Sequence, residues 1–332
     1  MTHANGDLPQ LQAADGPWSI YLHVPFCASR CGYCDFNTYV LSAMGEDAIS
    51  GYLEAAHREL DLAGQMWRRR PAVSTIFFGG GTPTMLTPAQ LGELVDHIRT
   101  VWGIDDDAEI TTEANPETLD EDVLSGLLAA GINRLSMGMQ SSDEFVLTIL
   151  DRRHRPGRAV EMARLARQVG FDDVSLDLIF GAPGEDLGSW RCSLEAALSA
   201  EPDHVSAYSL IVEEGTRLAA RIRRGELPMT DEDNLADKYL IAEKALTEAG
   251  YVNYEVSVED HEVLDTEQHH EETVLLQLRL ADGLPLSELT EVERHRADHV
   301  VEQGLGAIRG GHLVLNLSGR MVADRIITDL LV

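Results

Sequence analysis

The chain has 332 residues, 44% of them hydrophobic and 25% charged, which is enough material for one large domain and a smaller one with buried cores. Its formal net charge of -30 argues against a nucleic-acid backbone or an anionic membrane surface as partner, because both require clustered Lys and Arg. We interpret this charge as a source of solubility.

The first 17 residues are polar, and we expect a disordered tail there rather than a secretory signal peptide. No apolar run approaches the roughly 20 residues that span a bilayer, so we expect no integral membrane segment. Three of the four cysteines, Cys27, Cys31 and Cys34, lie close together. Because no signal peptide or membrane span is expected, we expect a cytoplasmic protein. In that reducing compartment such a group of cysteines indicates a metal site or catalysis rather than disulfides.

Short apolar runs alternate with longer amphipathic stretches along the first two thirds of the chain. The runs predict six buried parallel strands, at 19–24, 75–78, 110–113, 134–139, 174–179 and 204–210. The amphipathic stretches predict helices at 47–66, 88–101, 119–130, 158–169 and 189–198. This alternation predicts an α/β fold, a partial (β/α)6 barrel with its chemistry at the carboxyl ends of the strands.

The pattern changes after the sixth strand. Residues 231–249 predict a long amphipathic helix, and residues 262–332 predict a smaller α+β module. We expect this winged-helix-like module to end in a hairpin with strands at 312–317 and 320–326. The chain therefore divides into a core at 18–255 and the C-terminal module, whose acidic surroundings argue against DNA binding.

The cysteines follow the first expected strand with the spacing C-x3-C-x2-C. On a loop, this spacing lets the thiolates of Cys27, Cys31 and Cys34 converge on one face of a metal cluster. Three protein ligands on a four-iron cube leave one iron open to a further ligand. A zinc site completed by Cys192 or a histidine, and unliganded cysteines, remain as alternatives. We expect Cys192 itself to be buried in a helix.

Eight motifs follow one another between Tyr21 and Glu214, within a resemblance that covers nearly the whole chain from Trp18: Tyr21-Leu-His-Val-Pro-Phe-Cys27, Cys31-Gly-Tyr-Cys34-Asp-Phe36, Phe78-Gly-Gly-Gly-Thr-Pro83, Thr112-Glu-Ala-Asn-Pro116, Arg134-Leu-Ser-Met-Gly-Met-Gln140, Arg152-Arg-His154, Asp177-Leu-Ile-Phe-Gly-Ala-Pro-Gly184 and His204-Val-Ser-Ala-Tyr-Ser-Leu-Ile-Val-Glu-Glu214. Together they resemble the oxygen-independent coproporphyrinogen oxidase family of radical S-adenosylmethionine (SAM) proteins. Within it the chain is most similar to the HemW-type heme chaperones. The coproporphyrinogen dehydrogenases carry a further cysteine at the position of Phe36.

The resemblance implies a [4Fe–4S] cluster on the three cysteines and a SAM molecule beside it. The implied SAM-binding residues are Tyr21, Tyr33, Gly80, Gly81, Thr82, Glu113, Gln140, Arg152, Asp177 and Ile211. We expect Glu113 to pair with the SAM ammonium group and Arg152 with its carboxylate. A tight turn at the glycines, a half-buried filler role for Tyr21 and a core role for Ile211 remain as alternatives. His23 is expected to be a hydrogen-bonded core residue.

The chain departs from the family pattern near residues 258–262, where a long segment is missing. That segment normally contains an H-N-x-x-Y-W motif, associated with heme binding, and a G-x-G-A-H-S stretch. The resemblance implies heme as a ligand, and the missing motif argues against it in this chain. His261, His269 and His270 are either substitute axial ligands or surface residues.

The resemblance implies a heme chaperone that carries a cluster and SAM and passes heme to an acceptor protein. An electron donor such as flavodoxin or ferredoxin is the second expected partner. The alternatives are a radical SAM oxidoreductase acting on a porphyrinogen, which the residue at Phe36 disfavours, and a cluster-binding remnant with no further activity.

Overall fold

The computed structural model describes residues 17–67, 72–229, 231–253 and 266–331. The chain forms two compact units, Met1–Ala242 and Glu243–Val332. Nearly all of the expected N-terminal tail, and the position of the missing family segment, lie outside the described residues.

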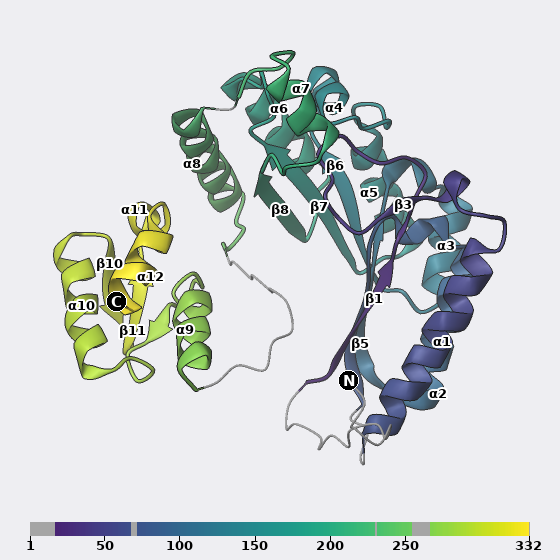
Figure 1. The fold of residues 1–332 in the computed structure, drawn as a ribbon, viewed down its shortest axis with the longest axis horizontal. Helices are drawn as coiled ribbons and strands as arrows, with labels where there is room; N and C mark the ends of the chain where they lie inside the picture. Colours follow the sequence, from purple (N-terminus) through teal and green to yellow (C-terminus); the bar gives the residue numbers. More distant parts are fainter. Residues whose placement is uncertain (1–16, 68–71, 230, 254–265, 332) are drawn as a thin grey trace. The chain divides into compact units, whose positions relative to one another are not determined.

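A six-stranded sheet forms the centre of the first unit (Figure 1). Its strands, hydrogen-bonded in chain order, are β1 (Ser19–Val24), β4 (Val73–Gly80), β5 (Ile104–Ala114), β6 (Arg134–Gln140), β7 (Asp173–Phe180) and β8 (His204–Ser209). All five pairings are parallel, so the carboxyl ends of the strands meet at one edge. The sheet is open between β1 and β8 in the part of the chain that the structure describes, which agrees with the predicted partial barrel.

The predicted helices are present and lie along one face of the sheet (Figure 1). They are α1 (Ala48–Met66), α2 (Pro88–Val101), α3 (Glu121–Ala129), α5 (Arg158–Val169) and α6 (Leu187–Leu198). The start of α2 shows why its prediction succeeded. The Thr87 side chain accepts a hydrogen bond from the backbone N–H of Gln90, whose side chain caps Thr87 in return, and Pro88 occupies the first turn.

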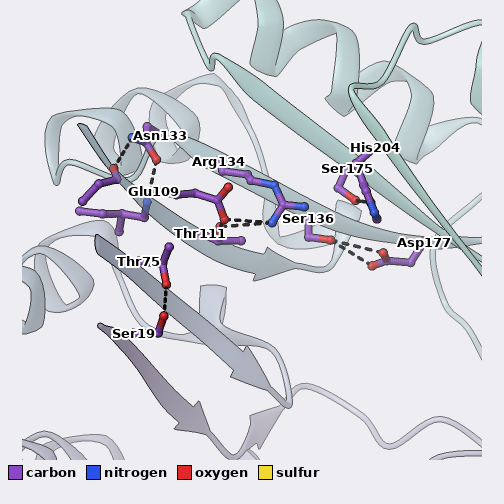
Figure 2. A network of polar contacts seen from close by, with 12 residues as sticks. Ser19, Thr75, Glu109, Thr111, Asn133, Arg134, Ser136, Ser175, Asp177 and His204 are labelled. Carbon is purple, nitrogen blue, oxygen red and sulfur yellow. Dashed lines mark hydrogen bonds and ion pairs between the residues drawn. The ribbon is translucent and has the colours of Figure 1, made fainter. Parts of the chain in front are cut away.

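The two faces of the sheet differ in polarity because successive strand residues alternate between them. On the face packed by helices, residues such as Ile76, Phe78 and Leu176 are at most 1% exposed. Burying each such side chain contributes roughly 1.5–3 kcal/mol. The opposite face carries a polar network that crosses the middle strands, seen in Figure 2. Its links include Arg134 with Glu109 at 3.4 Å and Ser175 with His204 at 2.9 Å.

The first half of α8 (Glu232–Glu248) is anchored to the end of β7 by a buried ion pair. Lys238 Nζ lies 3.0 Å from Glu185 Oε2, and both side chains are completely buried. The lysine also donates to the Glu185 carbonyl at 2.8 Å, and Trp190 Nε1 donates to the Lys238 carbonyl at 2.9 Å. A buried charge is tolerated only when it is paired and hydrogen-bonded in this way.

The second unit packs its helices on a three-stranded antiparallel sheet of order β10-β11-β9. Its elements are α9 (Thr266–Gln277), β9 (Leu284–Pro285), α10 (Glu291–Glu302), β10 (Gly306–Arg309), β11 (His312–Leu315), α11 (Leu317–Arg320) and α12 (Ala323–Leu331). Its core contains Leu278, Leu284 and Leu313, each fully buried.

The predicted C-terminal hairpin was placed too late in the chain. The hairpin is β10–β11, and it turns at Gly310 and Gly311, which have φ of +56° and +85°. Glycine adopts these left-handed values without steric cost, so the turn forms there. Residues 323–331 are helical because Ile326, Ile327 and Leu330 recur at helical spacing and are buried on one face.

We predict that Lys238→Met lowers the free energy of unfolding of the first unit by roughly 3–5 kcal/mol, because it leaves the buried Glu185 carboxylate without its cation. The loss should be smaller at pH 5 than at pH 8, since Glu185 can then take up a proton. Urea unfolding followed by circular dichroism measures both. Lys244→Met is the control: Lys244 is exposed and 3.9 Å from Glu248, so its loss should stay below about 1 kcal/mol. Equal losses in the two variants would contradict the assignment.

Candidate functional site

The cysteine loop connects two short paired strands, β2 (Phe26–Cys27) and β3 (Tyr39–Val40), at the edge where the strands of the sheet end. Each of the three sulfurs has a polar neighbour. The pairs are Cys27 with Thr82 at 3.9 Å, Cys34 with Thr38 at 3.9 Å, and Cys31 with the Arg152 guanidinium at 3.5 Å. Hydrogen-bond donors beside sulfur stabilise thiolates and tune a metal centre. This donor set fits a [4Fe–4S] cluster with three protein ligands.

Burial raises the pKa of the Cys27 thiol, and its neighbours Cys34 and Cys31 raise it further. Cys34 and Cys31 therefore lie close enough to Cys27 to influence its thiol. Among the described residues, no three His, Cys, Asp or Glu side chains are gathered closely enough to hold a single metal ion. A four-iron cluster provides a separate iron for each thiolate, so it spans more widely placed sulfurs.

The middle of the loop is held by backbone hydrogen bonds to distant segments. Gly32 N donates to the Leu150 carbonyl at 3.1 Å, and Leu218 N donates to the Gly32 carbonyl at 2.8 Å. A Cβ at Gly32 would lie 2.5 Å from Asp151 Oδ2, so a larger residue there requires the Asp151 side chain to move. Asp151 has φ of +55°, a left-handed conformation that is uncommon outside glycine and often marks functional sites.

Arg152 connects the cysteine loop to the end of β6. Its Nη1 donates to Cys31 Sγ at 3.5 Å and its Nη2 donates to the Gly138 carbonyl at 2.8 Å. A shift in strand register lies between Gly138 and Gln140, and Gln140 has φ of +63°. Such a bulge re-aims the side chain that follows it. Arg152 Nε and Gln140 Oε1 are buried and have no hydrogen-bond partner within the described chain, so both can bind a polar ligand.

Two carboxylates lie beside this arginine, Glu113 on β5 and Asp177 on β7, the two strands that flank β6. Burial, together with the nearby Asp177, raises the pKa of Glu113 to about 7, although its Oε2 accepts a hydrogen bond from Gly80 N at 3.0 Å. Burial also raises the pKa of Asp177, which accepts from the Ser136 hydroxyl at 3.3 Å. Figure 2 shows Asp177 and Ser136 projecting from adjacent strands. We call the edge formed by Glu113, Asp177, Arg152 and Gln140 the rim. A cationic ligand at the rim would lower the pKa of both carboxylates, and Glu113 would release its proton.

The glycine run after β4 is accounted for by the protein's own packing. A Cβ at Gly79 would lie 2.8 Å from the Phe77 and Tyr21 rings, and one at Gly81 would lie 2.6 Å from the Phe26 carbonyl. Gly80 has φ of +111°. The glycines therefore continue β4 to Gly80 instead of forming a tight turn, and contact of Gly80 and Gly81 with a ligand stays a prediction.

Tyr33 lies within the cysteine loop, packed against a buried cluster that includes Leu210. Ile211 is 68% exposed and Tyr21 is 58% exposed, so a core role for Ile211 and a half-buried filler role for Tyr21 are both wrong. Both side chains are available to a ligand.

His23 is hydrogen-bonded on both ring nitrogens, as expected, but it is only partly buried and so is not a core residue. Its Nε2 lies 3.0 Å from the Asn37 carbonyl, which can only accept. Nε2 therefore carries the proton, and in the neutral ring Nδ1 accepts from the Tyr21 hydroxyl at 3.1 Å. The histidine thus orients Tyr21.

Cys192 is exposed on α6, which corrects the expectation of burial. The buried face of α6 is formed by Trp190, Ser193, Leu194 and Ala197, and Cys192 lies off that face.

Sequence reasoning missed Thr38, Asp151 and Leu218. Neither Asp151 nor Leu218 carries a local signal, because each contacts the cysteine loop only through tertiary structure. Only Thr38 could have been predicted from the sequence, because a hydroxyl four residues after Cys34 can reach back to the Cys34 sulfur.

Two family comparisons match this architecture. Residues 21–196 match the radical SAM superfamily, and residues 264–322 match the HemN C-terminal domain. A solved structure of coproporphyrinogen III oxidase (HemN) from Escherichia coli superimposes with a TM-score of 0.80 over 95% of this chain and 90% of that chain. Its sequence identity is 21%, so this likeness shows the fold alone.

The curated relatives are closer in sequence. Heme chaperone HemW from Mycobacterium tuberculosis is 39% identical over 382 aligned positions, which cover 98% of each chain. Heme chaperone HemW from Bacillus subtilis is 38% identical over 72% of this chain and 62% of its own. The chain belongs to the radical SAM superfamily and, within it, to the HemW family. Superfamily membership implies a [4Fe–4S] cluster and SAM. No helix among the described residues combines the length and apolar character needed to cross a bilayer.

We predict that Glu113→Gln stabilises the SAM-free protein above pH 7 and leaves its stability unchanged near pH 4.5. The folded protein holds a proton on Glu113 that the unfolded chain releases between pH 4.5 and about 7, so wild-type stability falls as pH rises through that window. The gain at pH 8 should reach at most about 3 kcal/mol, and urea unfolding at pH 5 and pH 8 measures it. The exposed Glu117→Gln serves as control; the same pH dependence in both variants would refute the prediction.

Proposed function

We propose that this protein is a heme chaperone that binds a [4Fe–4S] cluster through Cys27, Cys31 and Cys34, binds SAM beside it, and transfers heme to an acceptor protein in the cytoplasm. The observation that carries the proposal is the 39% identity to the HemW chaperone of M. tuberculosis across 98% of both chains. The convergence of three thiols, each with a polar neighbour, supports the cluster assignment.

The rim around the cysteines suits the charge pattern of SAM, which carries an ammonium, a carboxylate and a sulfonium. Glu113 would pair with the ammonium group, and its proton would leave when the cation arrives. Arg152 would turn its unpartnered Nε to the SAM carboxylate while its Nη1 remains on Cys31. Gln140 would offer its free Oε1 to a SAM donor.

Other residues would enclose the rest of SAM. Tyr33 and the exposed Ile211 are available to pack against the adenine, and Tyr21 lies near Glu113, whose charge raises the pKa of the phenol in addition to burial. Asp177 would accept from a ribose hydroxyl. Gly80, Gly81 and Thr82 would line the end of β4. When bound, the cluster and SAM together supply one-electron chemistry, and these residues position the ligand and exclude water.

The proposal of heme binding depends on the family relationship and on histidines that lie outside the described residues. The aligned length of 382 positions exceeds the 332 residues of this chain, which supports a missing family segment. His261 lies outside the described residues, as does the side chain of His269. His270 Nε2 lies 2.9 Å from a Glu293 carboxylate oxygen, and Glu293 also caps α10, so His270 has a packing role in the second unit.

The first prediction from this proposal concerns the cluster. After anaerobic reconstitution, Cys27→Ala, Cys31→Ala and Cys34→Ala should each lose most of the bound iron and sulfide and the visible absorption of the cluster, because each removes one of three thiolates. Cys192→Ala is the matched control and should retain wild-type iron content, since its side chain is exposed on α6. Normal iron in any of the three loop variants would exclude that cysteine as a ligand.

The second prediction concerns heme. An anaerobic hemin titration of the reconstituted protein should give a saturable shift of the Soret absorption. The shift should persist in His270→Ala, because that imidazole is already hydrogen-bonded to Glu293. Loss of the shift in His261→Ala or His269→Ala would identify a relocated axial ligand. Absence of any shift in the wild-type protein would refute the chaperone proposal for this chain and assign heme binding to the missing segment.

A further inference from the structure

A cluster of arginines lies on α7 (Arg217–Arg223) and the residue that follows it. Arg217, Arg221, Arg223 and Arg224 fall within residues 217–224, which contain no Asp or Glu, although the chain has 56 acidic residues and only 26 Lys and Arg. Glu213 and Glu214 precede α7 at its amino end, so the positive charge is concentrated toward the carboxyl end of the helix. We call these four residues the arginine patch.

The arginine patch is only partly neutralised by neighbouring acids. Asp151 lies 3.2 Å from Arg217, and Glu226 lies 2.5 Å from Arg224 and 3.8 Å from Arg221. Two carboxylates therefore serve three guanidinium groups. Arg223 is exposed and has no ion pair within the described chain. The side chains of Arg217 and Arg224 are 65% and 58% exposed, so they can reach a partner.

The surface at the arginine patch is hollowed. A pocket of about 460 Å³ is lined by Thr148, Asp151, Arg217, Ala220, Arg221 and Arg224. Three of these six residues are arginines. A concave surface with several guanidinium groups fits protruding carboxylates, which each guanidinium can bind through two parallel hydrogen bonds.

The helix that carries the patch is bonded directly to the cysteine loop. Arg217 Nη2 donates to the carbonyl of Arg30, which precedes Cys31, at 2.6 Å. Leu218 N donates to the carbonyl of Gly32, which follows Cys31, at 2.8 Å. The first turn of α7 therefore contacts both residues that flank the central cysteine. A protein docked on the patch would be held next to the cluster.

We propose that the arginine patch is the docking surface for an acidic electron-carrier protein that reduces the cluster. The inference rests on the proposed function only in requiring the cluster. One electron would leave the reduced flavin or iron–sulfur centre of the carrier, and the oxidised cluster would accept it, so no further reactant is needed. Charge complementarity of this kind accelerates association and selects the acidic partner, because the rest of this protein repels it.

The test compares two double variants with the same change in net charge. Arg223→Glu/Arg224→Glu reverses the exposed end of the patch. Arg58→Glu/Arg99→Glu is the matched control on α1 and α2; Arg99 is 51% exposed and paired with Asp96, much as Arg224 is paired with Glu226. Stopped-flow absorbance measures reduction of the reconstituted cluster by the hydroquinone of a purified bacterial flavodoxin. Photoreduced deazaflavin, which is small and uncharged, measures reduction without docking.

At low ionic strength the patch variant should be reduced by flavodoxin about tenfold or more slowly than wild type, and the difference should shrink at about 0.5 M salt. Reduction by deazaflavin should be unchanged in both variants. Calorimetry should show that oxidised flavodoxin binds the patch variant more weakly than wild type, whereas the control variant binds as wild type does. This measurement needs no cluster. Arg223→Gln/Arg224→Gln should show an intermediate effect.

Equal slowing in both double variants would mean that only net charge matters, and wild-type rates in the patch variant would place docking elsewhere; either result overturns the proposal. Binding of a DNA oligonucleotide that the patch variant loses, with flavodoxin reduction intact, would assign the arginines to a nucleic acid instead. Hemin titration of the same samples separates the two proposals, because heme binding by wild type does not depend on how the cluster is reduced.

Discussion

The backbone of Gly32 is hydrogen-bonded to two segments distant in the sequence: its N–H donates to Leu150, and its carbonyl accepts from Leu218. The cysteine loop has little regular structure of its own, so these bonds limit its freedom and fix where the sulfurs point. The fit is close: a side chain at Gly32 would displace the carboxylate of Asp151. The same contact brings Arg152, two residues after Leu150, to Cys31, and brings α7 to the loop.

The electrostatics of the rim follow from burying unlike charges together at the edge of the sheet. Glu113 on β5 and Asp177 on β7 lie near each other on either side of β6, where burial disfavours their ionised forms. Arg152 remains cationic beside them because a guanidinium keeps its proton even when buried. The rim therefore has a fixed positive side and a side that becomes negative when a cation arrives. That arrangement suits an amino-acid ligand with an ammonium and a carboxylate.

Much of the first unit could be predicted from the sequence because its signals are local. The runs at β4 and β7 are apolar enough to be recognised as buried strands, and Thr87-Pro88 marks the start of α2. Predictions failed where one local pattern suits two structures. The residues at 320–326 alternate well enough to suggest a strand, yet Ile326, Ile327 and Leu330 also share a helical face, and packing in the second unit selects the helix.

The sequence by itself determined the six-stranded parallel fold, the identity of the three candidate ligands and the acidic net charge. Each of these depends on the composition or on a pattern of neighbouring residues, because hydrophobic periodicity and cysteine spacing extend over only a few positions. Only the tertiary structure decided that Arg152 contacts Cys31, that Cys192 is exposed, and that α7 lies against the cysteine loop. These contacts join residues far apart in the chain, and the packing of the whole unit, not any local preference, sets which of them form.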